Sequence, residues 1–174
     1  MGELGMALPG LRERAAAIAA LPSLGVLTLA GMTPPHWEVS LHGAPSITNS
    51  FINEVAAIRP TLVAVSALTA SAFEAYQLAD ALRASGIRTV LGGLHATTEP
   101  DDALRHFDSV VIGDGEPVWH DLLADAESGR LALRYSASRP FNLADAPLPR
   151  FELLNRSRRQ RYTVQTQRGC PLAC

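Results

Sequence analysis

The stretch Ile87-Arg88-Thr89-Val90-Leu91-Gly92-Gly93-Leu94-His95 decides the fold class of this chain. Its apolar and β-branched run stops at two glycines, which is typical of the carboxyl end of a buried strand. The segment Thr97-Thr98-Glu99-Pro100-Asp101 then offers a hydroxyl cap and a proline, which predict a helix start. Open α/β sheets bind ligands at such strand ends, where glycine lets a ligand approach the backbone. The glycines alone are equally typical of a tight turn.

The pattern of strand, small-residue loop and helix occurs three times. Strands are expected over residues 62–65, 87–91 and 109–112. The loops after them read Ser66-Ala67-Leu68-Thr69-Ala70, Gly92-Gly93-Leu94-His95-Ala96 and Gly113-Asp114-Gly115-Glu116. Such repetition predicts an α/β fold with a doubly wound parallel sheet, in which all three loops lie at one edge. Three coordinated loops of small residues indicate a binding site.

Helical periodicity is found over residues 47–58, 72–82 and 117–126, with a short helix expected near 101–105. Ser71 and Glu74 have the spacing of a capping box at the start of the second helix, and Gly86 is expected to end it. Its buried face is expected to hold Ala72, Ala75, Tyr76, Ala79 and Leu82. Short strands are expected over residues 37–41 and 131–135, whereas residues 21–32 fit a strand or a buried helix.

The composition is that of a globular protein, with 174 residues, 47% hydrophobic and 18% charged. The chain has no lysine, which excludes a P-loop lysine and a Schiff-base or pyridoxal phosphate lysine. Residues 15–37 carry no Asp, Glu or Arg, but prolines and glycines interrupt them. A cytoplasmic protein without a membrane span is therefore expected.

Charge and proline content divide the chain. Residues 1–149 have nine arginines and sixteen acidic residues, a net charge of −7, whereas residues 150–174 have six arginines and one glutamate, a net charge of +5. We expect a helical segment over residues 1–20, a domain over 21–136 and a Pro/Arg-rich linker over 137–161. A new, incomplete domain is expected over 162–174, opening with a strand over 162–167. The arginines of residues 156–161 fit a solvated linker or domain interface better than a nucleic-acid site.

The chain finishes with Arg168-Gly169-Cys170-Pro171-Leu172-Ala173-Cys174. This spacing resembles the opening of the radical S-adenosylmethionine (SAM) cluster motif, in which a third cysteine follows three residues later. There, three thiolates hold a [4Fe–4S] cluster, whose open iron binds SAM. By this resemblance Cys170 and Cys174 would be metal ligands in a longer protein; the two-cysteine spacing alone also fits a redox pair, chance or free thiols.

Segments further upstream make the resemblance more specific. Residues 24–30, 34–39, 66–69, 92–95 and 113–116 follow in the order found in cobalamin-binding radical SAM proteins. From about residue 20 to 174 the chain resembles the N-terminal cobalamin-binding domain of that family, in the branch that includes hopanoid methylases, with the first strand of the barrel. The resemblance implies a Rossmann-like or flavodoxin-like B12-binding fold and makes residues 21–32 its first helix.

The resemblance also implies that the three loops line the corrinoid and its nucleotide tail. The residues that would bind the cofactor are Ser66, Ala67, Leu68, Thr69, Ala70, Gly92, Gly93, His95, Ala96, Gly113, Asp114, Gly115 and Glu116. His95 would either hydrogen-bond in this cleft or only cap the following helix. Glu116 would either help to bind the cofactor or only balance the positive end of its helix dipole. The Asp-x-His-x-x-Gly motif is absent, which implies no protein histidine on cobalt. Residues 1–20 also lack a convincing first strand.

By resemblance the full-length protein would be a radical SAM enzyme that transfers a methyl group from methylcobalamin to an unactivated carbon, using SAM and a [4Fe–4S] cluster. This chain alone would be inactive, and its partners would be the corrinoid and the radical SAM barrel of the same polypeptide. Two alternatives remain open. One is a stand-alone, non-catalytic corrinoid carrier or regulatory module, and the other is a doubly wound domain that binds FMN or a nucleotide.

Overall fold

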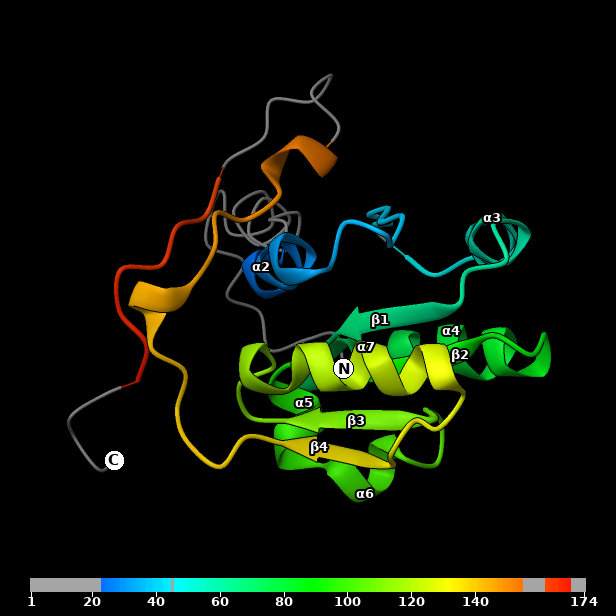
Figure 1. Cartoon of the computed structure of the whole chain (residues 1–174). Coiled ribbons are helices and arrows are strands. Elements are labelled where there is room, and N and C mark those ends of the chain that lie inside the picture. The colour runs from blue at the N-terminus through cyan, green and yellow to red at the C-terminus, as the bar shows by residue number, and fades with distance from the viewer. Residues whose placement is uncertain (1–22, 45, 155–161, 170–174) are drawn as a thin grey trace, which may run out of the picture.

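The structure is a computed structural model that describes residues 23–44, 46–154 and 162–169. Within these ranges, four parallel strands form one sheet in the order β1-β2-β3-β4, with all carboxyl ends at the same edge (Figure 1). The strands are β1 (Leu62–Ser66), β2 (Arg88–Gly92), β3 (Ser109–Ile112) and β4 (Arg134–Ser136). The predicted parallel α/β sheet is confirmed, and the strand expected over residues 131–135 is its short edge strand.

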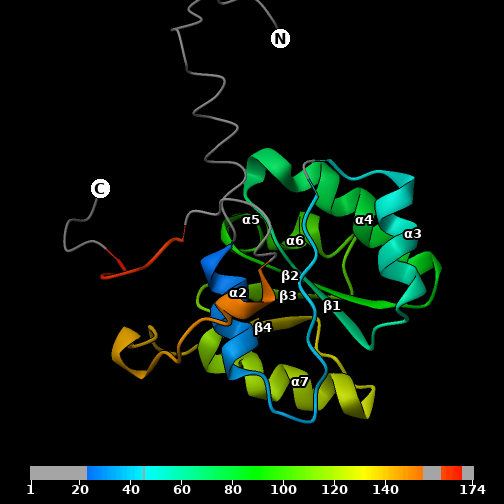
Figure 2. The same cartoon turned by 90° about the horizontal axis from the view of Figure 1, so that it is seen from above.

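Helices cover both faces of the sheet (Figure 2). One face carries α3, α4, α5 and α6, and the other carries α2 and α7. The helices are α2 (Leu24–Met32), α3 (Asn49–Ala57), α4 (Ala72–Ala84), α5 (Leu94–Thr98), α6 (Pro100–Ala103) and α7 (Trp119–Ser128). Within residues 21–32, Leu24–Met32 therefore form a helix, as the family resemblance implied.

The core lies on both sides of the two central strands, because successive strand side chains point to opposite faces. Leu91 and Val110 pack with Tyr76 of α4 and with Phe107. Val90 and Val111 pack with residues of α7, and Leu29 of α2 borders the same cluster. Burial on both faces explains why β2 and β3 read as continuous apolar runs.

The predicted end of α4 is confirmed in detail. Gly86 has a φ of 76°, and its N–H donates to the carbonyl of Arg83 over 2.9 Å. The N–H of Ile87 donates to the carbonyl of Leu82 over 3.0 Å. This pair of bonds is a Schellman motif, in which glycine takes the left-handed position. The five residues expected on the buried face of α4 are all buried.

Two predicted strands are wrong. Residues 37–41 form no strand, because the chain turns after Pro34 and Pro35 and the Trp37 side chain packs against the α7 side of the core. His36 Nε2 lies 2.7 Å from Glu127 Oε1, which holds this segment beside α7. Residues 162–167 also form no strand, since no neighbouring strand pairs with them among the described residues.

Two predicted helix caps are also wrong. Ser71 precedes α4, but its hydroxyl donates back to the Leu68 carbonyl over 3.1 Å and makes no capping bond. Thr97 and Thr98 lie inside α5, where their hydroxyls donate to carbonyls four residues earlier, so they do not open the next helix. Pro100 does begin α6, as predicted. Among the residues that the structure describes, every helix is too short or too polar to cross a membrane.

Candidate functional site

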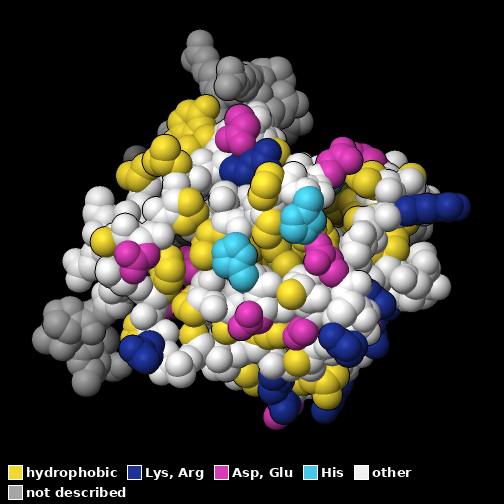
Figure 3. All heavy atoms as spheres, in the orientation of Figure 1, with side chains coloured by type: hydrophobic (Ala, Val, Ile, Leu, Met, Phe, Trp, Pro, Cys, Tyr) yellow, Lys and Arg dark blue, Asp and Glu magenta, His cyan; other side chains and the backbone are white. Residues whose placement is uncertain are grey.

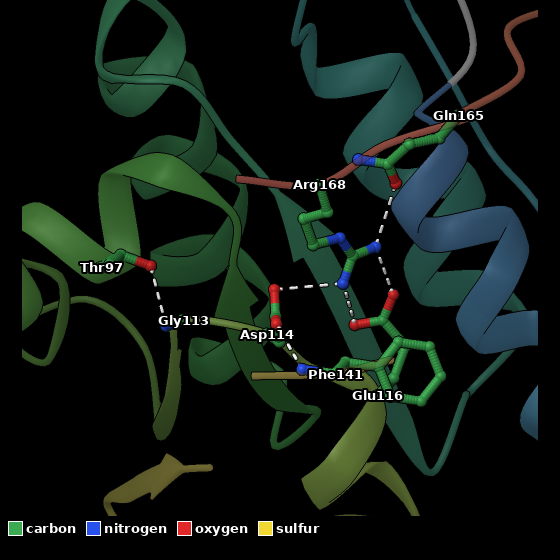
Figure 4. Close-up of polar contacts among 7 residues, drawn as sticks. All are labelled: Thr97, Gly113, Asp114, Glu116, Phe141, Gln165 and Arg168. Atoms are coloured by element: carbon green, nitrogen blue, oxygen red, sulfur yellow. Dashed lines mark hydrogen bonds and ion pairs between the residues drawn. The ribbon is translucent and has the colours of Figure 1, made fainter. Parts of the chain in front are cut away.

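The three predicted loops lie together at the carboxyl edge of the sheet and are joined by hydrogen bonds. The N–H of Ala67 donates to the Gly92 carbonyl, and the N–H of His95 donates to the Ala67 carbonyl, each over 3.2 Å. The third loop is linked to α5, the helix that continues from the second loop, because the Gly113 N–H donates to Thr97 Oγ1 over 3.0 Å (Figure 4). The fold therefore brings the candidate residues of all three loops to one place.

Glycine is required at Gly93 by the neighbouring loop. This residue has φ 90° and ψ −170°, a conformation that is essentially restricted to glycine. A Cβ atom there would lie 3.0 Å from both the Ala67 carbonyl oxygen and Ser66 Oγ. The space that glycine was expected to leave for a ligand is thus filled at Gly93 by the first loop.

Gly113 is different. Its φ is also positive, at 78°, but a Cβ atom there would meet nothing within 4 Å. Gly115 packs against α2, since its Cβ position lies 3.4 Å from Leu29 Cδ1. Of these loop glycines, Gly113 is therefore the one whose backbone is open to close approach by a ligand.

Part of the loop surface is exposed and apolar. Leu68 and Leu94 have 61% and 58% of their surfaces exposed, although both are large aliphatic residues. Ser66, Thr69, Ala70, Gly93 and Gly113 are also exposed, whereas Ala67, His95, Ala96 and Glu116 are buried. Small residues flanked by exposed leucines form a surface that suits a large, flat and partly apolar ligand.

His95 takes part in a buried hydrogen-bond network instead of pointing to solvent. The Tyr76 hydroxyl donates to Asp102 Oδ2 over 2.9 Å and lies 2.6 Å from His95 Nε2. Because this hydroxyl has only one hydrogen, which it donates to Asp102, it accepts the hydrogen bond from His95 Nε2. Thr69 Oγ1 lies 3.3 Å from Nδ1 and is the partner there. Both ring nitrogens of His95 are thus engaged, and the ring supports the first loop through Thr69.

Tyr76 and Asp102 were not identified from the sequence as site residues. Tyr76 was recognised only as part of the buried helix face, and no spacing links it to His95. Its ring stacks on His106 with 4.0 Å between ring centroids. Burial and the hydrogen bond to Asp102 raise the pKa of Tyr76 to about 12. The hydroxyl therefore keeps its proton over the physiological pH range and remains a donor to Asp102.

The carboxylates of the third loop bind an arginine from a distant part of the same chain. Glu116 is buried, with 5% of its side chain exposed, and its Oε1 lies 2.7 Å from Arg168 Nη2. Arg168 Nη1 donates to Glu116 Oε2 over 3.0 Å and to Asp114 Oδ1 over 3.1 Å. Figure 4 shows the guanidinium lying between the two carboxylates. Arg168 was read in the sequence only as part of the cysteine motif, so this role of Glu116 and Asp114 was missed.

The predicted metal ligands Cys170 and Cys174 lie outside the described residues. Among the residues that are described, no group of three or more His, Cys, Asp or Glu side chains could hold a metal ion. The arginine cluster of residues 156–161 is likewise outside the described part. On the face shown in Figure 3, acidic and basic side chains are scattered among apolar ones.

Three curated relatives are methyltransferases. The chain is 32% identical over 164 residues to bacteriochlorophyllide d C-8(2)-methyltransferase of Chlorobaculum tepidum, covering 87% of this chain and 34% of that protein. It is 31% identical over 118 residues to the C-12(1)-methyltransferase of the same organism, with coverage of 65% and 26%. An uncharacterized methyltransferase of Synechocystis is 27% identical over 155 residues, with coverage of 88% and 28%. The chain thus spans about a third or less of these relatives.

Among solved structures, the N-terminal domain of a hypothetical protein from Thermotoga maritima is similar, with a TM-score of 0.46 and 23% identity. The similarity covers 64% of this chain and 88% of that one. Residues 15–123, more than half of the chain, match the family described as B12 binding domain. This range includes all three loops and the strands that carry them. The chain therefore belongs to the B12-binding domain family.

Proposed function

We propose that the chain binds cobalamin at the carboxyl edge of its sheet, through the three joined loops. The observation that carries this proposal is the surface around Gly113, where an open glycine backbone lies among loops that expose Leu68 and Leu94. The leucines would pack against the apolar parts of the ligand, and small residues would admit its bulk. When bound, cobalamin supplies a cobalt centre that can carry a methyl group.

The state of His95 supports binding without a histidine of these loops on cobalt. Its ring is buried, with 4% of the residue exposed, and both ring nitrogens have partners in the network with Tyr76 and Thr69. A metal–imidazole bond would require breaking that network and moving a buried ring. We therefore expect a bound corrinoid to show a base-off spectrum without histidine coordination.

The first test is a visible-absorbance titration of the purified chain with hydroxocobalamin and methylcobalamin, followed by desalting. Co-elution of the corrinoid with a base-off spectrum is the expected result. Loss of the corrinoid on desalting, or a spectrum with histidine on cobalt, would contradict the proposed site. The parent chain and its variants are compared in the same buffer.

Substitutions of the two exposed leucines test the proposed binding surface directly. Leu68→Asp and Leu94→Asp place a charge on the proposed binding surface without opening the core, and we expect each to weaken binding at least about tenfold, or about 1.4 kcal/mol. Leu133→Asp is the matched control, because Leu133 is similarly exposed at 66% but precedes β4 at the opposite edge. Equal affinity of all four proteins would show that the corrinoid binds elsewhere.

For the longer protein, we propose methyl transfer from methylcobalamin to an unactivated carbon by a radical SAM enzyme. The supporting observations are the methyltransferase relatives, of which the chain spans 34% and 26%, and the Cys170 and Cys174 spacing. These two cysteines would supply thiolates to a [4Fe–4S] cluster, at which SAM would bind. Cobalamin would lie in the domain described here.

Anaerobic reconstitution of the extended polypeptide with iron and sulfide tests this second part. A four-iron cluster is expected, together with its loss in Cys170→Ser and in Cys174→Ser. Methyl transfer from labelled methylcobalamin should then require SAM and a reductant. An extended protein that binds cobalamin but no cluster would instead favour the non-catalytic carrier.

A further inference from the structure

Arg168 satisfies a carboxylate that would otherwise be buried without a cation. Glu116 has 5% of its side chain exposed, and both of its oxygens bond to the same guanidinium, at 2.7 and 3.0 Å. A buried carboxylate is costly unless it is paired, and a two-point arginine contact is the strongest common form of pairing. The hydrogen bond to Glu116 raises the pKa of Arg168, so the guanidinium stays charged.

Asp114 fastens both the beginning and the end of the segment that follows the domain. Its Oδ2 accepts from the Phe141 N–H over 2.9 Å, and its Oδ1 accepts from Arg168 Nη1 over 3.1 Å. The Arg168 guanidinium carbon also lies 5.8 Å from the centre of the Phe141 ring. Residues 141 and 168, which are far apart in the sequence, therefore meet on the third loop (Figure 4).

The intervening segment is also attached to the domain, on the side of α2. The Arg150 N–H donates to the Leu27 carbonyl over 3.0 Å. Near the end of the same helix, a Cβ atom at Gly31 would lie only 2.7 Å from the Leu148 carbonyl oxygen, so the two backbones are in close contact. Figure 1 shows this orange and red part of the chain passing the carboxyl edge of the sheet. The described linker residues thus lie along the domain.

We propose that Arg168 is a positioning residue, which clamps the chain leading to Cys170 onto Glu116 and Asp114. Cys170 follows Arg168 by two residues, so their Cα atoms are at most about 7 Å apart. The clamp would therefore hold the first cysteine near the third loop. Its consequence for cofactor chemistry rests on the proposed function, because the clamp matters to that chemistry only if the corrinoid binds at the same sheet edge as the third loop.

A nitroxide label on Cys170 measures the clamp directly. The chain has two cysteines, so Cys174→Ser leaves one labelling site. In Arg168→Gln and in Glu116→Gln we expect the label to reorient about threefold faster in its EPR spectrum, since a released segment moves on the nanosecond timescale. Arg139→Gln is the matched control, because it removes an exposed arginine from the same linker.

Charge reversal separates a clamp from a folding defect. Glu116→Arg alone should release the label, and adding Arg168→Glu should restore at least part of the slow motion, with unchanged circular dichroism. Slow motion that persists in both Arg168→Gln and Glu116→Gln would overturn the proposal. So would equal release in Arg139→Gln.

A second measurement uses paramagnetic cob(II)alamin bound to the labelled chain. We expect it to speed the relaxation of the nitroxide, and we expect Arg168→Gln to reduce this effect while the cofactor stays bound. Equal relaxation in the labelled parent and in Arg168→Gln would show that the clamp does not hold Cys170 near the cofactor. The measurement of label mobility needs no cofactor. If the chain does not bind cobalamin at the proposed site, only the relaxation measurement is affected.

Discussion

At the scale of single residues, two loop glycines with positive φ should respond differently to alanine. Gly93 has a φ of 90°, and a Cβ atom there would lie 3.0 Å from two oxygen atoms, whereas Gly113 has a φ of 78° and open space. We expect Gly113→Ala to cost about 1 kcal/mol in the free energy of unfolding, from backbone strain, and Gly93→Ala to cost about 3 kcal/mol or more. Urea denaturation of both variants checks this order, and equal losses would show that the contact with the first loop is unimportant.

Ser109 offers a second test at this scale. The residue is fully buried at the start of β3, and its Oγ has no hydrogen-bond partner among the residues that the structure describes. Ser109→Ala removes an unsatisfied buried hydroxyl, so we expect an increase in stability of about 1 kcal/mol and a rise in Tm of about 3 °C.

The control for Ser109 is another buried hydroxyl that does have a partner. Thr89 Oγ1 donates to Asp108 Oδ2 over 3.1 Å and is fully buried. Thr89→Val keeps the shape but removes this bond, and we expect it to lower the free energy of unfolding by about 1–2 kcal/mol. A Ser109→Ala variant that is destabilised as much as Thr89→Val would mean that the Ser109 hydroxyl is satisfied in solution.

At the scale of elements, Tyr76 connects α4 to α5 and α6, because its hydroxyl contacts His95 and Asp102. Its pKa is raised to about 12, mainly by burial, whereas a tyrosine in the unfolded chain titrates near 10. Between pH 10 and 12 the unfolded state therefore loses the proton that the folded state keeps. The contribution of Tyr76 to stability should be constant below pH 10 and fall as the pH rises toward 12.

Tyrosine-to-phenylalanine variants show which tyrosine causes this loss of stability at alkaline pH. Burial likewise raises the pKa of Tyr135 to about 12, so both tyrosines should contribute. Tyr76→Phe and Tyr135→Phe should each make the fall in the urea midpoint between pH 10 and 12 shallower, and the double variant should remove most of it. An unchanged slope in Tyr76→Phe would show that its hydroxyl ionises equally in both states.

The elements that were predicted well are those whose signals are local. The strands β1, β2 and β3 are continuous apolar runs, and Gly86 marks the end of α4 through its own backbone preference. The prediction over residues 37–41 was wrong because alternation cannot show that Trp37 packs beside α7 with no strand next to it. The Ser71 cap was wrong because a 3₁₀ turn at Thr69–Ser71 directs the hydroxyl to Leu68 instead.

At the scale of the whole molecule, the place of the site was predictable and the partners within it were not. Parallel strands with small residues at their carboxyl ends bring the loops together, and the structure joins them by hydrogen bonds. Glu116 was selected as a candidate ligand, yet its partner Arg168 is 52 residues away in the sequence. Contacts made by a returning linker leave no spacing pattern, so only the folded chain reveals them.

The attachment of that linker gives a last prediction, based on two glycines of α2. A Cβ atom at Gly25 would meet nothing within 4 Å, whereas one at Gly31 would lie 2.7 Å from the Leu148 carbonyl oxygen. Alanine favours helix over glycine, so Gly25→Ala should stabilise the protein by up to about 1 kcal/mol. Gly31→Ala should instead push the linker off α2 and cancel this gain.

Trypsin provides the measurement, because it cleaves after arginine and the described part of the linker holds Arg150 followed by Phe151, whereas Arg139 precedes a proline and resists cleavage. In Gly31→Ala we expect cleavage after Arg150 to become several-fold faster, since local detachment exposes its backbone, while Gly25→Ala keeps the parental rate. Arg150 is the informative site, because its N–H donates to Leu27 of α2 in the attached state. Equal cleavage in both variants would mean that the linker already detaches readily from α2 in the parent protein. The contact of Arg168 with the third loop would then not depend on the contact between the linker and this helix.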